Sequence, residues 1–310
     1  MAAVVVAEHL TKSYGGSRGV VDLSFEVQAG EVFGFLGPNG AGKSTTIRTM
    51  LDFIRPNDGR ITLFGLDSRT EGPAIHARVG YVPGEFGLYE RLTAEEYLRD
   101  FAAFRGDIPW ARIAALTERF QLELHPKIRN LSHGNRRKIA LIQAFMHEPD
   151  LLVMDEPTQG LDPLMQQEFF ALIDDVSERG VTVFLSSHVM PEVERLCDRV
   201  AIIREGRLIT VSDVGELKAN ALRTLTLHFD RPVGTGPFAT LASVLRAEAH
   251  GDTVRLTIKG TVDEVLKEAA RHTVVNIASE EPSLEDAFLE IYRNGGDGGD
   301  GGDGGGGDHA

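Results

Sequence analysis

The sequence predicts an α/β fold with a mixed sheet around a phosphate-binding loop. An apolar run at residues 32–36 leads into a glycine-rich segment at residues 37–45, which matches G-x-x-x-x-G-K-[ST] and is followed at once by a helical pattern. Two further apolar runs, at 151–154 and 181–185, end in polar residues, as buried parallel strands do at their carboxyl ends. Beyond residue 220, strands and helices alternate without such a motif, which predicts a small α+β domain over 221–293.

Length and composition limit the possible classes of protein. At 310 residues the chain is long enough for about two domains. The formal net charge of −14 argues against a broad nucleic-acid-binding face, so we expect no nucleic acid as partner. The single cysteine, Cys197, cannot form a disulfide within the chain and indicates a reducing compartment. No run approaches the roughly 18 to 20 apolar residues that span a bilayer, so in any role at a membrane another chain does the spanning.

The glycine-rich segment at 37–45 has the chemistry of a loop that surrounds phosphates. Glycines let successive backbone N–H groups turn inward, and the following helix N-terminus adds partial positive charge. Lys43 is expected to reach the β- and γ-phosphates of ATP, and the Ser44 hydroxyl to bind Mg²⁺. A glycine-rich turn with a chance lysine is the alternative. The expected nucleotide-binding residues here are Gly37, Pro38, Asn39, Gly40, Ala41, Gly42, Lys43, Ser44, Thr45 and Thr46.

An aromatic residue precedes this loop in a region that reads as antiparallel strands, residues 4–30. Tyr14 can stack on an adenine ring, which gives affinity with little base selectivity. A tyrosine that only covers the small sheet is an equally good interpretation of Tyr14 alone.

Two apolar strands carry the candidate catalytic groups at their ends. Asp155 is placed to hold Mg²⁺, and Glu156 to orient or deprotonate an attacking water. The alternative is an acidic pair that is merely exposed to solvent at the end of a strand. The phosphate loop in the same chain argues against this alternative. His188 follows the next apolar strand and can reach the γ-phosphate, although a lone histidine is more often structural.

A helical subdomain is expected to be inserted between these motifs, over about residues 86–147. Residues 79–89 read as a strand that enters a loop rich in glycine, and helical periodicity then runs over 93–124 with Thr93 as N-cap. A further helix at 136–146 follows Ser132, His133, Gly134 and Asn135, so these residues lie at a second helix N-terminus. The segment is either a second anion site or an ordinary serine N-cap.

The last part of the chain is read as short elements and a tail. The expected elements are strands at 224–229, 253–258 and 274–277 and helices at 237–247, 261–271 and 283–292. Residues 294–310 repeat glycine and aspartate without an apolar residue to bury in a core, which predicts a disordered tail.

Taken together, these motifs resemble those of the nucleotide-binding subunit of an ATP-binding cassette (ABC) transporter. The resemblance covers roughly residues 2–215 and implies a nucleotide-binding domain over 2–220. The C-terminal part of the chain, with its segment at 281–288, is similar to the C-terminal domain of drug- and antibiotic-export ATPases that serve a separate six-helix permease. In the family's terms, residues 37–45 match the Walker A loop, 151–156 the Walker B strand with its catalytic glutamate, 131–135 the signature sequence, 159–162 the D-loop, His188 the switch histidine and Tyr14 the adenine-stacking aromatic.

The resemblance implies a function and partners. It implies hydrolysis of ATP with Mg²⁺, coupled to export of a drug, antibiotic or lipid-like compound through a separate membrane permease. It places the chain at the cytoplasmic face of the membrane, and it implies a dimer of two copies in which Ser132 to Asn135 of one chain close over the nucleotide of the other. The alternative is a soluble ABC ATPase that acts on ribosomes or DNA, and a regulatory module without turnover is a third possibility, against which Glu156 argues.

Three departures from the family pattern bear on the site. Gly84 stands where the family usually has glutamine, and we expect Glu85 to replace that residue at the metal and the attacking water. His133 and Asn135 replace the usual glycine and glutamine of the signature. Gln159 stands where serine is common in the D-loop.

Overall fold

The computed structural model describes residues 2–15, 19–85, 87–106, 108–280 and 283–294. The chain divides into two compact units, Met1–Asp213 and Val214–Ala310. The predicted boundary at 220 therefore lies one short helix too late, because α8 (Val214–Asn220) packs against α11 (Leu284–Asn294) of the second unit. The predicted glycine and aspartate tail, apart from Asn294, and the predicted start of the helical subdomain at Phe86 lie outside the described residues.

The first unit is organised around a six-stranded sheet in the order β10-β9-β3-β8-β7-β6. Five strands run parallel and β10 runs antiparallel to β9. All described residues of β3, β7 and β8 are buried, which explains their continuous apolar sequence. The strands are β3 (Val32–Leu36), β6 (Val79–Val82), β7 (Leu151–Asp155), β8 (Thr182–Ser187), β9 (Arg199–Arg204) and β10 (Arg207–Asp213).

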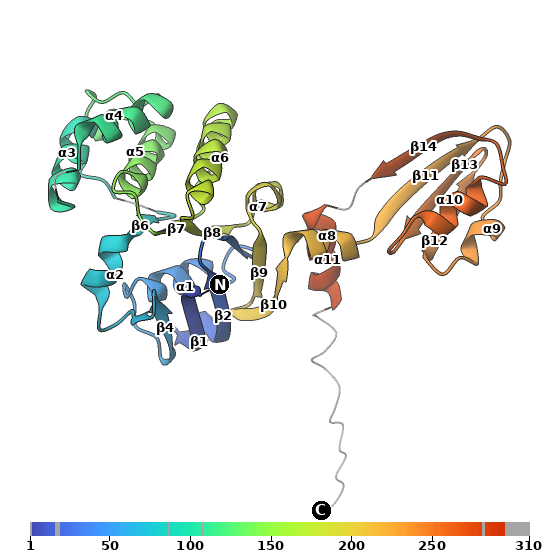
Figure 1. Ribbon diagram of the computed structural model, residues 1–310, viewed down its shortest axis with the longest axis horizontal. Helices are drawn as coiled ribbons and strands as arrows, with labels where there is room; N and C mark the ends of the chain where they lie inside the picture. Colours follow the sequence, from blue (N-terminus) through green and yellow to red (C-terminus); the bar gives the residue numbers. More distant parts are fainter. Residues whose placement is uncertain (1, 16–18, 86, 107, 281–282, 295–310) are drawn as a thin grey trace, which may run out of the picture. The chain divides into compact units, whose positions relative to one another are not determined.

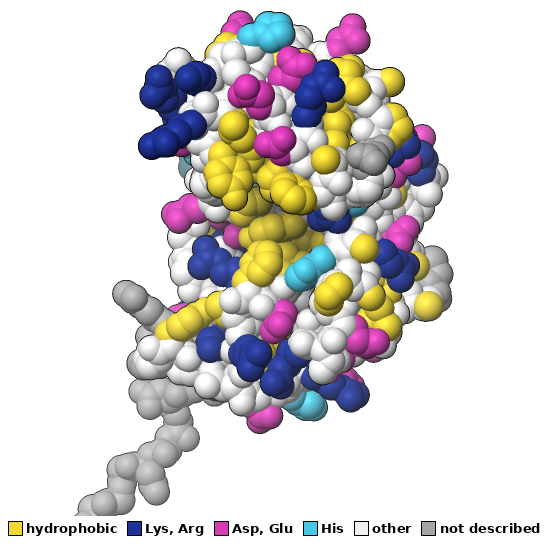
Figure 2. Space-filling view, turned by 90° about the vertical axis from the view of Figure 1, so that its left-hand side faces the viewer, with side chains coloured by type: hydrophobic (Ala, Val, Ile, Leu, Met, Phe, Trp, Pro, Cys, Tyr) yellow, Lys and Arg dark blue, Asp and Glu magenta, His cyan; other side chains and the backbone are white. Residues whose placement is uncertain are grey.

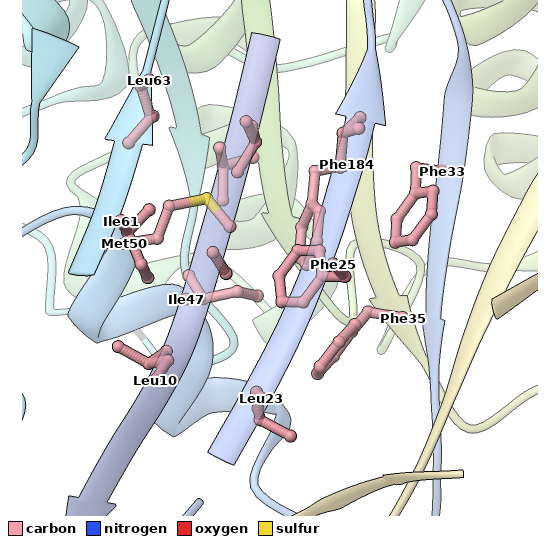
Figure 3. Packing of buried hydrophobic residues seen from close by; sticks show 14 of the residues in the cluster. Leu10, Leu23, Phe25, Phe33, Phe35, Ile47, Met50, Ile61, Leu63 and Phe184 are labelled. Atoms are coloured by element: carbon pink, nitrogen blue, oxygen red, sulfur yellow. The ribbon is translucent and has the colours of Figure 1, made fainter. Parts of the chain in front are cut away.

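A second, antiparallel sheet forms the other wall of this unit's core, as predicted for its N-terminal residues. Its order is β2-β1-β4-β5, from β1 (Ala3–Ser13), β2 (Gly19–Gln28), β4 (Asp58–Leu63) and β5 (Leu66–Asp67). Helix α1 (Lys43–Met50) contributes Ile47 and Met50 to the core between the sheets. Figure 3 shows the rings of Phe25 and Phe184 facing each other there, with centroids 6.1 Å apart. The helix that follows the phosphate loop is thus anchored in the core.

The α-helices that the structure describes in the helical subdomain gather together in Figure 1. They are α3 (Ala94–Phe104), α4 (Trp110–Arg119) and α5 (His133–Phe145). Thr93 caps α3 as predicted, and the side chain of Glu96 completes a capping box. The helical pattern at 93–124 is interrupted at Gly106, whose φ of +92° cannot continue a helix.

The other α-helices described in the first unit are α2 (Gly72–Arg78), α6 (Pro163–Glu178) and α7 (Met190–Leu196), and residues Ile128–Asn130 form a 3₁₀ helix. Cys197 follows α7 and is buried, as predicted, and burial raises the pKa of its thiol. Among the described residues, no helix combines the length and the apolar character needed to cross a membrane.

The second unit is a four-stranded antiparallel sheet in the order β12-β13-β11-β14, with Phe229, Phe238 and Leu256 in its core. The predicted helix at 237–247 is wrong. Helix α9 (Gly236–Ala239) is short, and β12 (Val244–His250) pairs with β13, because Ala247 and Ala249 fit opposite Leu256 and Val254. The other elements are β11 (Arg223–Phe229), β13 (Thr253–Ile258), α10 (Asp263–Ala269) and β14 (Val274–Glu280).

Candidate nucleotide-binding site

The loop between β3 and α1 has the shape that phosphate binding requires. Gly40 and Gly42 have φ angles of +81° and +110°, which favour glycine. A Cβ atom at Gly37 would lie 2.5 Å from the carbonyl oxygen of Ile203, and one at Gly42 would lie 2.6 Å from the side chain of Val20. The loop is therefore packed closely on β9 and β2, and only glycine fits at these turns.

Lys43 is held inside this loop by the loop's own backbone. Its side chain is 5% exposed, and Nζ donates to the carbonyl oxygens of Gly37 at 2.7 Å and Pro38 at 3.2 Å. Burial lowers the pKa of Lys43, while the carboxylates of Glu156 and Asp155 act in the opposite direction. The ammonium group is thus fixed where phosphate oxygens bound by the loop would meet it.

Asp155 and Glu156 lie at the carboxyl end of β7, as predicted. Asp155 is buried, and its Oδ1 accepts a hydrogen bond of 2.5 Å from the Ser186 hydroxyl on the neighbouring strand β8. Mg²⁺ prefers hard oxygen ligands and takes few from protein when phosphates supply the rest. The carboxylate of Asp155 and the hydroxyl of Ser44 are suitable oxygen donors.

The carboxylate of Glu156 lies between two basic side chains, those of Lys43 and His188. Oε1 is 3.5 Å from Nζ of Lys43 and 3.0 Å from Nδ1 of His188. The Glu156 side chain is 19% exposed, whereas that of His188 is 42% exposed. The fold thus brings Lys43, which lies more than 100 positions away in the sequence, to Glu156 and His188, and it leaves the carboxylate accessible to a water molecule.

The loop, Glu156 and Tyr14 line one pocket of about 930 Å³. Tyr14 is 55% exposed there, which suits a ring that is available for stacking, and Nζ of Lys12 lies 5.3 Å from its centroid. The sequence interpretation missed three charged residues of the lining: Lys12, Glu205 and Arg207. The turn at Glu205 and Gly206, between β9 and β10, is the sequence feature that could have indicated Glu205 and Arg207.

That turn is fixed to the phosphate loop by its glycine. The amide of Gly206 donates to the carbonyl oxygen of Ala41 at 2.9 Å, and the carbonyl oxygen of Gly206 accepts from the amide of Val21 at 2.8 Å. These two bonds keep Glu205 and Arg207 at the rim of the pocket.

The signature segment forms the N-terminus of α5, as predicted. Ser132 is the N-cap, and its hydroxyl accepts a hydrogen bond of 3.3 Å from the amide of Asn135. A Cβ atom at Gly134 would lie 2.7 Å from the carbonyl oxygen of Gly160, so the segment packs against the predicted D-loop. Ser132 to Asn135 are not among the described residues that line the nucleotide pocket, so they form a separate surface.

Glu85 occupies a different place from the other predicted metal ligands. It lines a second pocket, of about 540 Å³, together with apolar residues of α3 and β6, and it does not line the nucleotide pocket. Gly84 is the closer residue, because a Cβ atom there would lie 3.0 Å from Oδ2 of Asp155. The structure therefore does not bring Glu85 to the site, and its contact with Mg²⁺ stays a prediction.

Comparison with known proteins identifies relatives over up to 96% of the chain. The family model described as ABC transporter matches residues 20–159. The bacitracin transport ATP-binding protein BcrA of Enterococcus faecalis is 33% identical over 312 residues, covering 96% of this chain and 98% of BcrA. The linearmycin resistance ATP-binding protein LnrL of Bacillus subtilis (strain 168) is 33% identical, covering 92% and 97%. The probable multidrug ABC transporter ATP-binding protein YbhF of Escherichia coli (strain K12) is 38% identical over 223 residues, and this chain spans only 38% of its length.

Solved structures agree with this result. An ATP-binding subunit of an ABC transporter superposes with a TM-score of 0.64 at 30% identity, covering 69% of this chain and 92% of that one. The ATP-binding cassette MJ0796 bound to ADP and Pi has a TM-score of 0.62 at 22% identity, covering 68% and 98%, and shows the same fold. The chain belongs to the ABC transporter family of ATP-binding proteins.

Proposed function

We propose that the chain hydrolyses ATP and thereby drives export of a substrate through a separate membrane permease. The proposal of hydrolysis is supported mainly by the position of Glu156. Its carboxylate lies between Lys43 and His188, and Glu156 lines the nucleotide pocket. A carboxylate there can accept the proton of a water molecule that attacks the γ-phosphate.

The other residues have complementary roles in this mechanism. The backbone N–H groups of the loop and the Lys43 ammonium would bind the phosphate oxygens. His188 would orient the carboxylate of Glu156 through its 3.0 Å contact. Ser44 and Asp155 would hold Mg²⁺, which neutralises phosphate charge when it is bound. Tyr14 would stack on the adenine ring.

The transported compound and the permease are inferred from relatives and from one surface. BcrA and LnrL are named for bacitracin and linearmycin, and a further relative is named Nod factor export ATP-binding protein I. These names support a drug, an antibiotic or a lipid-like compound as cargo. The second pocket would receive the permease, because it is lined by Phe53, Leu88, Tyr97 and Phe101 and also by the basic side chains of Arg48 and Arg105.

Figure 2 shows a hollow with apolar side chains on one face of the molecule. An apolar helix of the permease with an acidic residue would suit the chemistry of that pocket. In this arrangement the chain lies at the cytoplasmic face of the membrane and is attached through the permease.

The substitution Glu156→Gln tests the mechanism. The amide preserves the shape and removes the negative charge, so turnover should fall about 10²- to 10⁴-fold while ATP still binds. Glu205→Gln is the matched control, because it makes the same change in the same pocket at a side chain that is 80% exposed. Both rates are measured by phosphate release from Mg-ATP. Turnover of Glu156→Gln close to that of Glu205→Gln would remove Glu156 from the mechanism.

A separate experiment tests the transport role. A tagged chain is purified from detergent extracts, and a permease should co-purify with it. Recovery with ribosomes or DNA instead would support the alternative, a soluble ABC ATPase.

A further inference from the structure

The largest fully buried side chain of the described protein is an arginine on the helix that begins at the signature segment. Arg137 lies on α5 and has no exposed surface. Its NH1 donates to the carbonyl oxygen of Pro83 and, at 3.5 Å, to that of Gly84. Its NH2 donates to the carbonyl oxygen of Glu156 and, at 3.4 Å, to that of Asp155.

The guanidinium group therefore joins two segments that are far apart in the sequence. One is the loop after β6, whose Pro83 lines the apolar pocket assigned above to the permease. The other is the end of β7, which carries the catalytic carboxylate. A planar fork with donors on both sides can bond both segments at once, which the single ammonium group of lysine cannot reproduce.

The backbone of Glu156 needs such support. Its φ of +49° lies in the left-handed region, which is disfavoured for residues other than glycine. Its amide donates to the carbonyl oxygen of Ser186 at 3.1 Å, and its carbonyl oxygen accepts from the amide of Gln159 at 3.2 Å and from Arg137. This conformation places the side chain of Glu156 within reach of Lys43 and His188.

We propose that Arg137 is a positioning residue for ATP hydrolysis. It holds Glu156 in its left-handed conformation and fixes it to the loop at Pro83 and Gly84, so that displacement of this loop is passed to the catalytic carboxylate. The inference rests on the proposed role of Glu156 in catalysis. Arg137 itself does not line the nucleotide pocket among the described residues, so its loss should act on turnover rather than on nucleotide binding.

The test compares two neighbouring arginines in the full-length chain. Arg137→Lys keeps the charge and loses the fork, and Arg137→Gln keeps one donor group without charge. Arg136→Lys is the matched control, because Arg136 bonds the carbonyl oxygens of Ile128 and Arg129 and lies outside this network. We expect kcat of Arg137→Lys to fall about 10- to 100-fold with an unchanged dissociation constant for ATP, as for a group displaced by about an ångström.

Hydrogen exchange examines the two anchored segments directly. The amides of Gly84 and Glu85 and those of Glu156, Thr158 and Gln159 should exchange faster in Arg137→Lys than in Arg136→Lys, while those of β3 should not change. Thermal unfolding of each variant is measured alongside. If both Arg137→Lys and Arg137→Gln are already unfolded at the assay temperature, the proposal is overturned, because Arg137 would then be needed for the fold itself.

A double-mutant cycle separates this inference from the role of Glu156. If Arg137 acts through Glu156, then Arg137→Lys should slow the residual turnover of Glu156→Gln by less than about twofold. An equal loss in both backgrounds would overturn the positioning role while leaving the proposed function intact. If Glu156→Gln retains normal turnover, the proposed catalytic role of Glu156 fails first, and that result is read from the single variant.

Discussion

Lys43 bonds the backbone of its own loop and is expected to bind phosphate, so a single substitution affects both interactions. In the structure its ammonium group bonds the loop carbonyls of Gly37 and Pro38, and it lies near Glu156. Phosphate oxygens bound in the loop would be a further partner for the same charge. Removing it deletes a buried cation from a site built for anions.

Lys43→Ala should therefore weaken ATP binding itself. Hydrogen bonds to charged groups contribute about 1.5–3 kcal/mol, so the dissociation constant should rise about 10- to 100-fold. Titration calorimetry with Mg-ATP measures it. Lys12→Ala is the control, because Lys12 is another cation of the same pocket but lies beside the exposed ring of Tyr14. Equal losses in the two variants would contradict the special role of Lys43.

At the scale of single residues, the sequence predicted the groups that local motifs define. Lys43, Asp155 and His188 lie where their strands and loop put them, because each follows an apolar run that becomes a central strand. Arg137 could not be predicted in this way. Its partners Pro83 and Glu156 are 54 and 19 residues away, and nothing in the local pattern of α5 marks one arginine of an Arg-Arg pair as fully buried.

At the scale of elements, continuity of apolar residues predicted strands better than propensity predicted helices. The three central strands were found because both of their faces are buried. The segment predicted as a helix at 237–247 contains alanine and leucine, which favour a helix, yet its residues 244–247 belong to β12, which pairs with β13.

The end of α5 is linked to β6 by a histidine whose titration should be visible in stability. Nε2 of His147 lies 3.1 Å from the carbonyl oxygen of Val79. Burial, with repulsion from Arg105, lowers the pKa of His147 from 6.5 to about 4. Between these values the unfolded chain binds more protons than the native one, so stability is full above pH about 6.5 and falls as the pH drops towards about 4.

His147→Gln should remove this part of the acid sensitivity, because glutamine has no proton to gain. The thermal midpoint of the variant should fall less between pH 7 and pH 4.5 than that of the unmodified chain. His125→Gln is the control, since the His125 side chain is 91% exposed. Parallel pH profiles for the His147→Gln variant and the unmodified chain would show that His147 does not contribute.

At the scale of the whole molecule, the two predicted anion-binding surfaces lie apart and require an explanation. The loop at 37–45 is sufficient to surround one triphosphate, yet Ser132 and the N-terminus of α5 form another surface that does not line the same pocket. A second copy would give this surface a partner. The helix N-terminus and Ser132 hydroxyl of one chain would then supply donors to the γ-phosphate bound by the other.

Dimerisation driven by ATP follows from this arrangement, and Glu156→Gln should preserve the dimer by blocking hydrolysis. We expect Glu156→Gln to sediment as a dimer with Mg-ATP and as a monomer without nucleotide. Adding Ser132→Arg should abolish the dimer, because a long cation then stands where the phosphate must approach. It should change the dissociation constant for ATP by less than about threefold, since the loop that binds phosphates is intact.

Thr240→Arg provides the comparison, because it adds the same charge at an exposed position of the second unit, and it should leave the dimer intact. A mixture of the two variants tests the dimer more sharply. Chains with both Ser132→Arg and Glu156→Gln should lower the dimer yield of Glu156→Gln chains in proportion to their share, because each dimer needs an intact signature segment from both chains. A monomer that persists at saturating ATP, with and without permease, would instead show that the two surfaces do not meet across a dimer.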